Sequence, residues 1–231
     1  MTPKEFASVW TREPRPSKGP GLTRDQIVRA AVELLDAEGL DALSMRKLGS
    51  KLGSGATSIY WHVANKHELL ELAYDQVWGE MTVPDARTVG WRDAISAFAH
   101  SMRHVILRHP WASGLIGRLP AVGPNALAIG DGSLKAYQLA GFAGLDISYA
   151  SAAVTAYIFG MTIPEVAWQA TMEPTTFEAV RATVVRAAAG HPDLLEQLEA
   201  HPIHDHATMR EVAFDFGLVV VLDGLERRLA T

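Results

Sequence analysis

Apolar residues recur at helical spacing along most of the chain, and no segment shows the sustained alternation of apolar and polar residues that a strand would show. One apolar stripe begins just after Thr23-Arg24-Asp25-Gln26, a capping box that predicts a helix start, and it ends at Gly39. Later in the chain the same spacing predicts helices over 91–109, 111–118, 124–141, 146–171, 176–189, 193–200 and 206–229. We therefore predict an all-α protein.

The stretch from Ser44 to Lys66 predicts two short helices joined by a glycine turn. Leu48 and Leu52 lie one turn apart on the first helix, and Gly53 can take the left-handed conformation that ends it. Gly49 leaves room for a second helix to cross closely. Two short helices in this order predict a helix-turn-helix.

The second helix of this pair, over about 56–62, has an apolar side and a polar side. Ile59 and Val63 are four residues apart, so we expect both to face inward. The residues expected on the outside are Thr57, Ser58 and Trp61, with Tyr60 and His62 at the edges. Hydroxyl and imidazole groups hydrogen-bond base edges or phosphates, while aromatic rings pack on sugars and thymine methyl groups. The outer side therefore predicts a DNA-binding surface, the alternative being that Tyr60 and Trp61 are core aromatics of a small bundle.

A third helix is expected directly after this surface. Asn65 can cap it with Glu68 reaching back, which places Lys66 in a first turn whose free amide groups favour a phosphate. We expect this helix to run from Lys66 to about Met81, because Pro84 closes it. It would connect the helix-turn-helix to the rest of the chain.

The formal net charge of -5 looks unsuited to a DNA-binding protein until the chain is divided at Lys66. Residues 1–66 hold 10 Lys and Arg against 7 Asp and Glu, a balance of +3. The rest of the chain holds the other 11 basic and 19 acidic side chains, a balance of -8. The positive charge therefore lies where DNA phosphates would be. The acidic remainder is expected to face solvent, a partner or a ligand.

The sequence predicts three regions. Residues 1–21 contain several prolines and glycines, carry more basic than acidic side chains and lack the apolar run of a signal peptide, so we expect a flexible N-terminal arm. Such an arm can reach along a DNA backbone or groove, or it can be a solvated tail without function. A helix-turn-helix domain is expected over 22–66, and a larger domain for ligand binding and dimerisation over 67–231.

The residue types present exclude several chemistries. The chain has no cysteine, no G-x-S-x-G, no phosphate-binding glycine loop and no H-E-x-x-H, so we expect neither an enzyme nor a bound cofactor. The segment with His201, His204 and His206 has the composition of a metal site, but Pro202 breaks any helical register and we expect a loop. Residues 147–164 carry no charge, yet their polar side chains are too many for a membrane span.

The last expected helix is apolar on two faces. One face carries Met209, Ala213, Phe216 and Val220, and the other carries Phe214, Leu218, Val221, Leu222 and Leu225. Both faces must be covered, and a second copy of the chain most simply covers one of them. We therefore expect a homodimer in which this helix and the 146–171 helix form a four-helix interface, the alternative being the central helix of a monomer.

Blocks of sequence in matching order carry a resemblance to a known family. LSMRKLGSKLGSGATSIYWHVANKHELL resembles the DNA-binding domain of TetR-family regulators, and its Ile-Tyr-Trp-His-Val block resembles the tetracycline-repressor branch. WRDAISAFAHSMRHVILRHPW, LPAVGPNAL and FDFGLVVVLDGLE resemble the C-terminal domain of that branch, so the resemblance covers about residues 22–229. It implies a cytoplasmic, homodimeric repressor that binds an inverted repeat in double-stranded operator DNA and leaves it when a small-molecule inducer binds.

The resemblance also implies which residues contact DNA. By position these are Arg46, Ala56, Thr57, Ser58, Tyr60, Trp61, His62 and Lys66. Ala56 departs from the tetracycline repressor, which has a base-reading glutamine at this position. Because alanine offers only a methyl group, we expect a different operator.

The ligand pocket departs further from that branch. Where tetracycline and magnesium are held by a histidine, an asparagine and a histidine, this chain has Thr82, Phe98 and Ile116, so magnesium-tetracycline is not implied. We predict an unidentified, largely apolar or aromatic inducer that binds without a metal, near a kink at Pro164. The lining residues we expect are Phe98, Met102, Ile116, Met161 and Trp168. Two alternatives stay open: a DNA-binding regulator that responds to no ligand, and a helical enzyme or carrier that happens to contain a helix-turn-helix.

Overall fold

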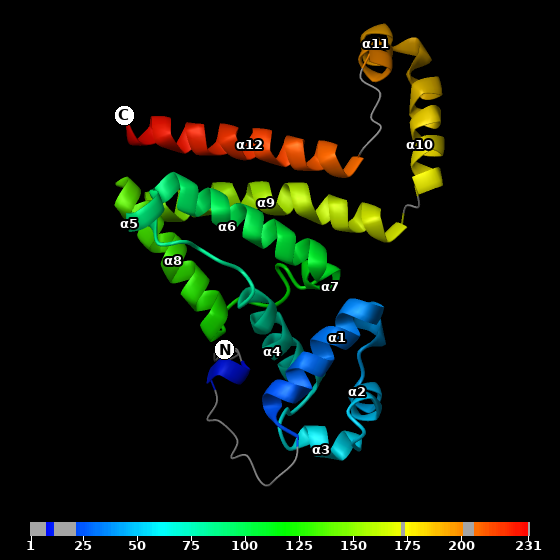
Figure 1. Cartoon of the computed structure of the whole chain (residues 1–231), viewed down its shortest axis with the longest axis vertical. Helices are drawn as coiled ribbons and strands as arrows, with labels where there is room; N and C mark the ends of the chain where they lie inside the picture. Colours follow the sequence, from blue (N-terminus) through cyan, green and yellow to red (C-terminus); the bar gives the residue numbers. More distant parts are fainter. Residues whose placement is uncertain (1–7, 12–21, 172–173, 201–205, 231) are drawn as a thin grey trace, which may run out of the picture. The chain divides into compact units, whose positions relative to one another are not determined.

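The computed structural model describes residues 8–11, 22–171, 174–200 and 206–230. Over these residues the regular secondary structure is helical, with no strand, as the apolar spacing predicts (Figure 1). The helices are η1 (Val9–Thr11), α1 (Arg24–Ala42), α2 (Met45–Lys51), α3 (Ala56–Tyr60), α4 (Lys66–Trp78), α5 (Ala86–Val89), α6 (Trp91–Arg108), α7 (Pro110–Ser113), α8 (Pro124–Ala140), α9 (Leu145–Thr171), α10 (Pro174–Ala187), η2 (Ala188–Gly190), α11 (Pro192–Ala200) and α12 (His206–Leu229).

The start of α1 is fixed by the predicted capping box. The Thr23 hydroxyl accepts a hydrogen bond from the Gln26 backbone nitrogen at 3.2 Å, and the Thr23 backbone nitrogen donates to Gln26 Oε1 at 2.9 Å. Gly39 has the expected positive φ of 78°, but helical turns resume after it and continue to Ala42. Gly39 therefore ends the first helical segment, as predicted, and a short second segment of α1 follows it.

Two short helices differ from the sequence prediction. A helix over 111–118 was expected, but α7 ends at Ser113, and turns follow in which Gly117 has a φ of 75°. The predicted helix is wrong beyond Ser113, because glycine readily leaves helical geometry.

Helix α5 was not predicted, since four residues are too few to show an apolar period. Asp85 begins α5 by accepting a hydrogen bond from the Arg87 backbone nitrogen at 3.0 Å.

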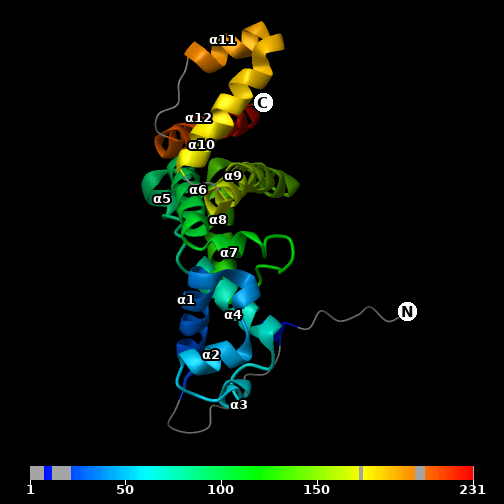
Figure 2. The same ribbon diagram turned by 90° about the vertical axis from the view of Figure 1, so that its right-hand side faces the viewer.

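The structure divides into two compact units, Met1–Ser151 and Ala152–Thr231, which are described separately. In the first unit α1 packs on α4, α2 on α3, and α8 on both α4 and α6 (Figures 1 and 2). Side chains buried in this unit include Ile27, Leu35, Leu48, Leu69, Ile95, Met102 and Tyr137. Because α4 packs against helices on both sides of Lys66, the domain boundary at Lys66 stays a prediction.

Helix α4 carries buried carboxylates that accept hydrogen bonds from different neighbouring segments. Glu68 Oε2 accepts from the Ala64 backbone nitrogen at 3.2 Å, just before the helix. Asp75 accepts from the backbone nitrogens of Asn125 at 3.3 Å and Ala126 at 3.0 Å, at the start of α8. Burial raises the pKa of Asp75, and these hydrogen bonds oppose the rise. Asp75 thus ties α4 to α8, which is distant in sequence, whereas the bond of Glu68 is local.

Another buried carboxylate of α4, Glu71, holds part of the N-terminal segment. Its Oε2 accepts from the Ser8 hydroxyl at 2.5 Å and from the Val9 backbone nitrogen at 3.0 Å, and its Oε1 lies 3.2 Å from His67 Nε2. Residues 8–11 therefore lie against α4, and the prediction of a flexible arm over 1–21 is wrong for these four residues. Their partner is a carboxylate more than 60 positions away, which no local pattern reveals. The other residues of the predicted arm lie outside the described part of the chain.

In the second unit α12 packs on α9 through one of its two apolar faces. The buried face includes Phe214, Leu218 and Leu222, and the exposed face includes Met209, Phe216 and Val220. The Tyr157 hydroxyl of α9 donates to the Phe214 carbonyl oxygen at 2.8 Å, and the two rings pack with centroids 5.5 Å apart. The predicted division of α12 into two apolar faces is therefore confirmed.

Among the described residues, α9 is the one helix long and apolar enough to cross a membrane. Length and composition alone are weak evidence, because core helices pass the same test. The exposed positions of α9 include the small residues Ala153, Ala156 and Gly160, which suit close helix packing. The helix continues through Pro164 to Thr171, and the predicted kink stays a prediction.

Candidate nucleic-acid interface

The frame of the helix-turn-helix rests on one cap and two glycines. The Ser44 hydroxyl accepts from the Lys47 backbone nitrogen at 3.2 Å and begins α2. Gly53 has a φ of 62°, the left-handed conformation that the sequence predicts. A Cβ on Gly49 would lie 2.8 Å from the Ser54 carbonyl oxygen, so a side chain here would push the turn away. The predicted close approach at Gly49 is confirmed, although its partner is the turn itself.

The phase of α3 is the predicted one. Ile59 and Val63 are fully buried, whereas Thr57 and Ser58 are exposed. Tyr60 is 46% exposed and Trp61 is 69% exposed. The alternative that these two aromatic side chains belong to the core is therefore wrong. Ala56 and His62 are partly exposed at the edges of the same surface.

Basic side chains of α2 lie near this surface. Arg46 is exposed, Lys47 pairs with Glu38 of α1, and Lys51 Nζ lies 2.9 Å from Glu33 Oε2. Exposed ion pairs of this kind contribute at most about 1 kcal/mol to stability. The two lysines are thus able to exchange their carboxylate partners for phosphates at little cost.

The start of α4 is capped as predicted, because Asn65 Oδ1 accepts from the Glu68 backbone nitrogen at 2.9 Å. Lys66 is exposed in the first turn, and its ammonium donates to the Leu40 carbonyl oxygen at 3.1 Å. This bond links the beginning of α4 to the end of α1, a contact that the sequence did not suggest. The contact of Lys66 with a phosphate stays a prediction.

The residues predicted to line a ligand pocket are divided between the two units. Phe98 and Met102 lie one turn apart on α6 and are buried, and Ile116 is partly exposed in the turns after α7. Met161 and Trp168 lie on α9 in the second unit and are partly exposed, with the Arg210 guanidinium 5.7 Å from the Trp168 ring centroid. The gathering of all five residues around one ligand stays a prediction.

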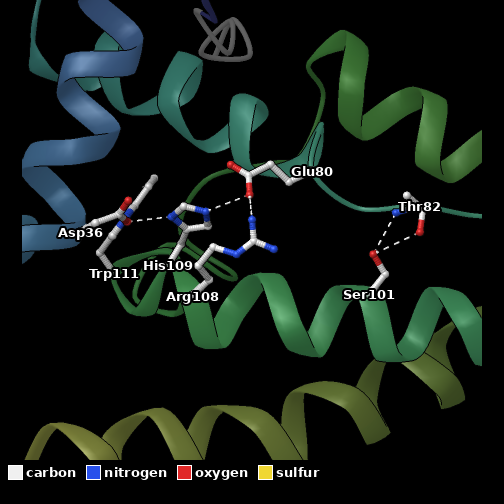
Figure 3. Close-up of polar contacts among 7 residues, drawn as sticks. All are labelled: Asp36, Glu80, Thr82, Ser101, Arg108, His109 and Trp111. Atoms are coloured by element: carbon white, nitrogen blue, oxygen red, sulfur yellow. Dashed lines mark hydrogen bonds and ion pairs between the residues drawn. The ribbon is translucent and has the colours of Figure 1, made fainter.

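A cluster that the sequence did not suggest joins α1 to the junction of α6 and α7 (Figure 3). His109 lies buried between α6 and α7, with Nδ1 2.7 Å from Asp36 Oδ1 of α1 and Nε2 3.1 Å from Glu80 Oε2, just after α4. The Trp111 indole donates to the same Asp36 oxygen at 2.6 Å, and Arg108 Nη1 donates to Glu80 Oε2 at 2.7 Å. We name these five residues the His109 cluster.

The histidine-rich segment with the composition of a metal site lies mostly outside the described residues, which exclude His201 and His204. Within the part of the chain that the structure describes, no group of three or more His, Asp or Glu side chains is placed to hold a metal ion.

The helical fold, the small helix-turn-helix and its exposed mixed surface define a class of protein, the DNA-binding transcription regulators. Residues 27–73 match the description "Bacterial regulatory proteins, tetR family", and residues 83–229 match "Tetracyclin repressor-like, C-terminal domain". Since the second match alone spans more than half of the chain, the protein belongs to the TetR family. It is a transcription regulator and not an enzyme.

Several relatives support this assignment. An HTH-type transcriptional regulator of Saccharopolyspora erythraea is 43% identical over 188 residues, which is 81% of this chain and 80% of the relative. The HTH-type transcriptional repressor DrrR1 of Streptomyces coeruleorubidus is 35% identical over 94% of this chain and 83% of its own length. The crystal structure of the TetR-family protein ActR of Streptomyces coelicolor in complex with actinorhodin has a TM-score of 0.76, 26% identity, and coverage of 92% of this chain and 100% of ActR.

Proposed function

We propose that the protein is a homodimeric repressor that binds an inverted repeat in operator DNA and is released by a small-molecule inducer. The observation that carries this proposal is the outer side of α3, where Thr57, Ser58, Tyr60 and Trp61 are exposed. Exposed aromatic rings beside hydroxyl groups form a surface that a partner covers. The major groove admits one helix and presents donors, acceptors and thymine methyl groups to such side chains.

The proposed contacts divide into base readout and phosphate binding. We assign Thr57 and Tyr60 to base readout, because they lie exposed on the outer side of α3. Arg46 and Lys66 are exposed cations on the neighbouring helices α2 and α4, which suits phosphates. The full proposed set is Arg46, Ala56, Thr57, Ser58, Tyr60, Trp61, His62 and Lys66. For Lys66 the contact would replace its bond to the Leu40 carbonyl.

The second copy of the chain would cover the exposed apolar face of α12. Met209, Phe216 and Val220 on this face are large apolar side chains, and α9 offers Ala153 and Ala156 as small ones. To enter successive major grooves, the two copies of α3 in such a dimer must lie about 34–36 Å apart. Such a dimer would act in the bacterial cytoplasm, where its operator lies.

The inducer we propose is largely apolar or aromatic and binds without a metal. Phe98 and Ile116 stand where a metal-dependent pocket of the tetracycline-repressor branch would need polar ligands. ActR, which shares this fold, has been crystallised with actinorhodin, and this supports an organic inducer for a related chain. We propose that the inducer shifts the population of α4 orientations, which changes the spacing of the two α3 helices.

A regulator that binds DNA without any inducer is the second candidate. The burial of Phe98 and Met102 favours it, because side chains that fill a core leave no space for a ligand. The two candidates differ in one measurable property, the release of DNA on addition of a compound.

The experiment begins with an operator selected from a pool of random duplexes, followed by anisotropy titrations over a range of salt concentrations. We expect a two-fold symmetric sequence and a steep loss of affinity with salt.

A panel of aromatic compounds is then added to the complex with and without a chelator. Release that the chelator does not affect supports the proposal, whereas release that requires magnesium overturns the metal-free inducer. DNA binding that no compound weakens favours the second candidate. If the protein binds no duplex, both candidate functions are wrong, and a helical enzyme or carrier that happens to contain a helix-turn-helix becomes the favoured alternative.

A further inference from the structure

The His109 cluster connects elements that belong to different functions. Asp36 lies on α1, which packs on α4 and against α2 of the helix-turn-helix. His109 and Trp111 belong to the junction of α6 and α7, and α6 also carries the proposed ligand residues Phe98 and Met102. Glu80 follows the end of α4 by two residues. The imidazole of His109 therefore touches the DNA-binding part, the connecting helix and the proposed ligand-binding helix at a single point.

The hydrogen-bonding partners at this point suit a positively charged ring. Both nitrogens of His109 face carboxylate oxygens, at 2.7 Å from Asp36 and 3.1 Å from Glu80. An ionised carboxylate only accepts hydrogen bonds, so each ring nitrogen must carry a hydrogen to make both contacts. The imidazolium and Arg108 then balance the two carboxylates, and the neutral Trp111 indole donates to the first of them. A neutral imidazole would keep only one of its two bonds.

We propose that His109 is a positioning residue that couples operator binding to the larger domain, by holding α1 to the end of α4 through a doubly hydrogen-bonded imidazolium. This inference rests on the proposed function and names a residue through which its regulation passes. Since coupling between two sites is reciprocal, DNA bound at α3 must change the local stability of the junction of α6 and α7. The proposal is therefore testable with DNA alone, before any inducer is known.

The same view offers a matched control (Figure 3). The Ser101 hydroxyl of α6 accepts from the Thr82 backbone nitrogen at 2.9 Å and lies 3.4 Å from the Thr82 hydroxyl. This contact also ties α6 to the segment after α4, but it includes no residue of α1. Its loss removes a similar polar contact without breaking the connection to the DNA-binding part.

The experiment measures amide hydrogen exchange of the full-length protein with and without its selected operator duplex. In the unmodified protein we expect DNA to slow exchange over residues 104–113 at least about fivefold, the lower end of typical coupling strengths. In His109→Gln this slowing should fall below about twofold, while DNA still slows exchange in α2 and α3. Ser101→Ala should keep the slowing of the unmodified protein.

A second variant covers the case in which His109→Gln does not fold. Asp36→Asn removes the negative charge on the α1 side of the same contact, and it should lose the slowing in the same way. Unchanged slowing in whichever of these variants folds, or equal loss in Ser101→Ala, overturns the proposal. A complete absence of DNA binding by the unmodified protein is a different outcome, because it refutes the proposed function itself.

Discussion

Trp61 after α3 and Phe216 on α12 are both large aromatic side chains that lie mostly exposed, at 69% and 74%. Each helix also buries an apolar face, with Ile59 on α3 and Phe214 on α12. Their exposed neighbours differ in kind. Thr57 and Ser58 give the α3 surface hydroxyl groups, whereas the neighbours of Phe216 on the outer face of α12 are aliphatic.

This difference decides which partner each surface suits. A mixed surface of rings and hydroxyl groups keeps its hydrogen bonds with water until DNA offers equivalent donors and acceptors. An aliphatic surface gains only from the loss of contact with water, which favours a permanent protein partner. The same fold thus presents one surface suited to a reversible contact and one suited to a lasting contact.

The largest expected effect is on the lasting contact. Val220→Asp would bury an unpaired charge in the proposed dimer interface, which costs several kcal/mol, about 3–5 by analogy with broken buried ion pairs. We expect sedimentation to show a monomer with reduced affinity for the full operator. Thr208→Asp adds the same charge at an exposed polar position of α12 and should leave the dimer intact. A dimer of unchanged stability in Val220→Asp would show that this face is not the interface.

The buried face of α12 should respond to a smaller change. A Cβ on Gly217 would collide with the Tyr157 ring, whose hydroxyl bonds the Phe214 carbonyl oxygen. Gly217→Ala should therefore lower the free energy of unfolding by about 1–3 kcal/mol. Gly224 on the same helix has no atom near its would-be Cβ. Gly224→Ala should raise stability by up to about 1 kcal/mol, since alanine favours helix. Equal effects in a denaturant titration would contradict the packing described for α12.

Substitutions on the α3 surface should change the sequence specificity of DNA binding. Thr57→Ala or Tyr60→Ala removes a proposed base contact, and the loss of discrimination should be about 1–3 kcal/mol at one operator position. Stability should change little, because both side chains are exposed. Competition binding with single-base operator variants measures the effect. Discrimination that stays intact at every position in both variants would remove these residues from base readout.

The smallest expected effect concerns the edge of the same surface. Lys66→Ala should weaken binding to all DNA sequences by a similar factor and reduce the slope of log affinity against log salt by about one unit. Lys135→Ala, which removes an exposed ammonium paired with Asp131 on α8, is the matched control and should leave the slope unchanged. If Lys66→Ala changes sequence preference at a constant slope, the roles of Lys66 and Thr57 are reversed.

Local sequence patterns predicted the structure of the helix-turn-helix almost completely. The cap at Ser44, the left-handed Gly53 and the inward phase of Ile59 and Val63 depend on residues within a few positions of each other, and periodicity reports such relations directly. The two faces of α12 were predictable for the same reason. Helix ends set by flexible glycines, as after α7, were less predictable, because glycine permits both continuation and departure.

Contacts between distant residues were decided by the tertiary structure alone. The hydrogen bonds of Glu71 with Ser8 and of His109 with Asp36 join residues more than 60 positions apart, and nothing in either neighbourhood marks the partner. In the sequence, a carboxylate that will be buried looks like any surface carboxylate. Only in the packed structure does a specific hydrogen-bond donor replace its water. The sequence by itself therefore determined the family, the exposed outer side of α3 and the two-faced last helix. The links from α4 to η1, α8 and the α6–α7 junction became visible only when the helices were packed together.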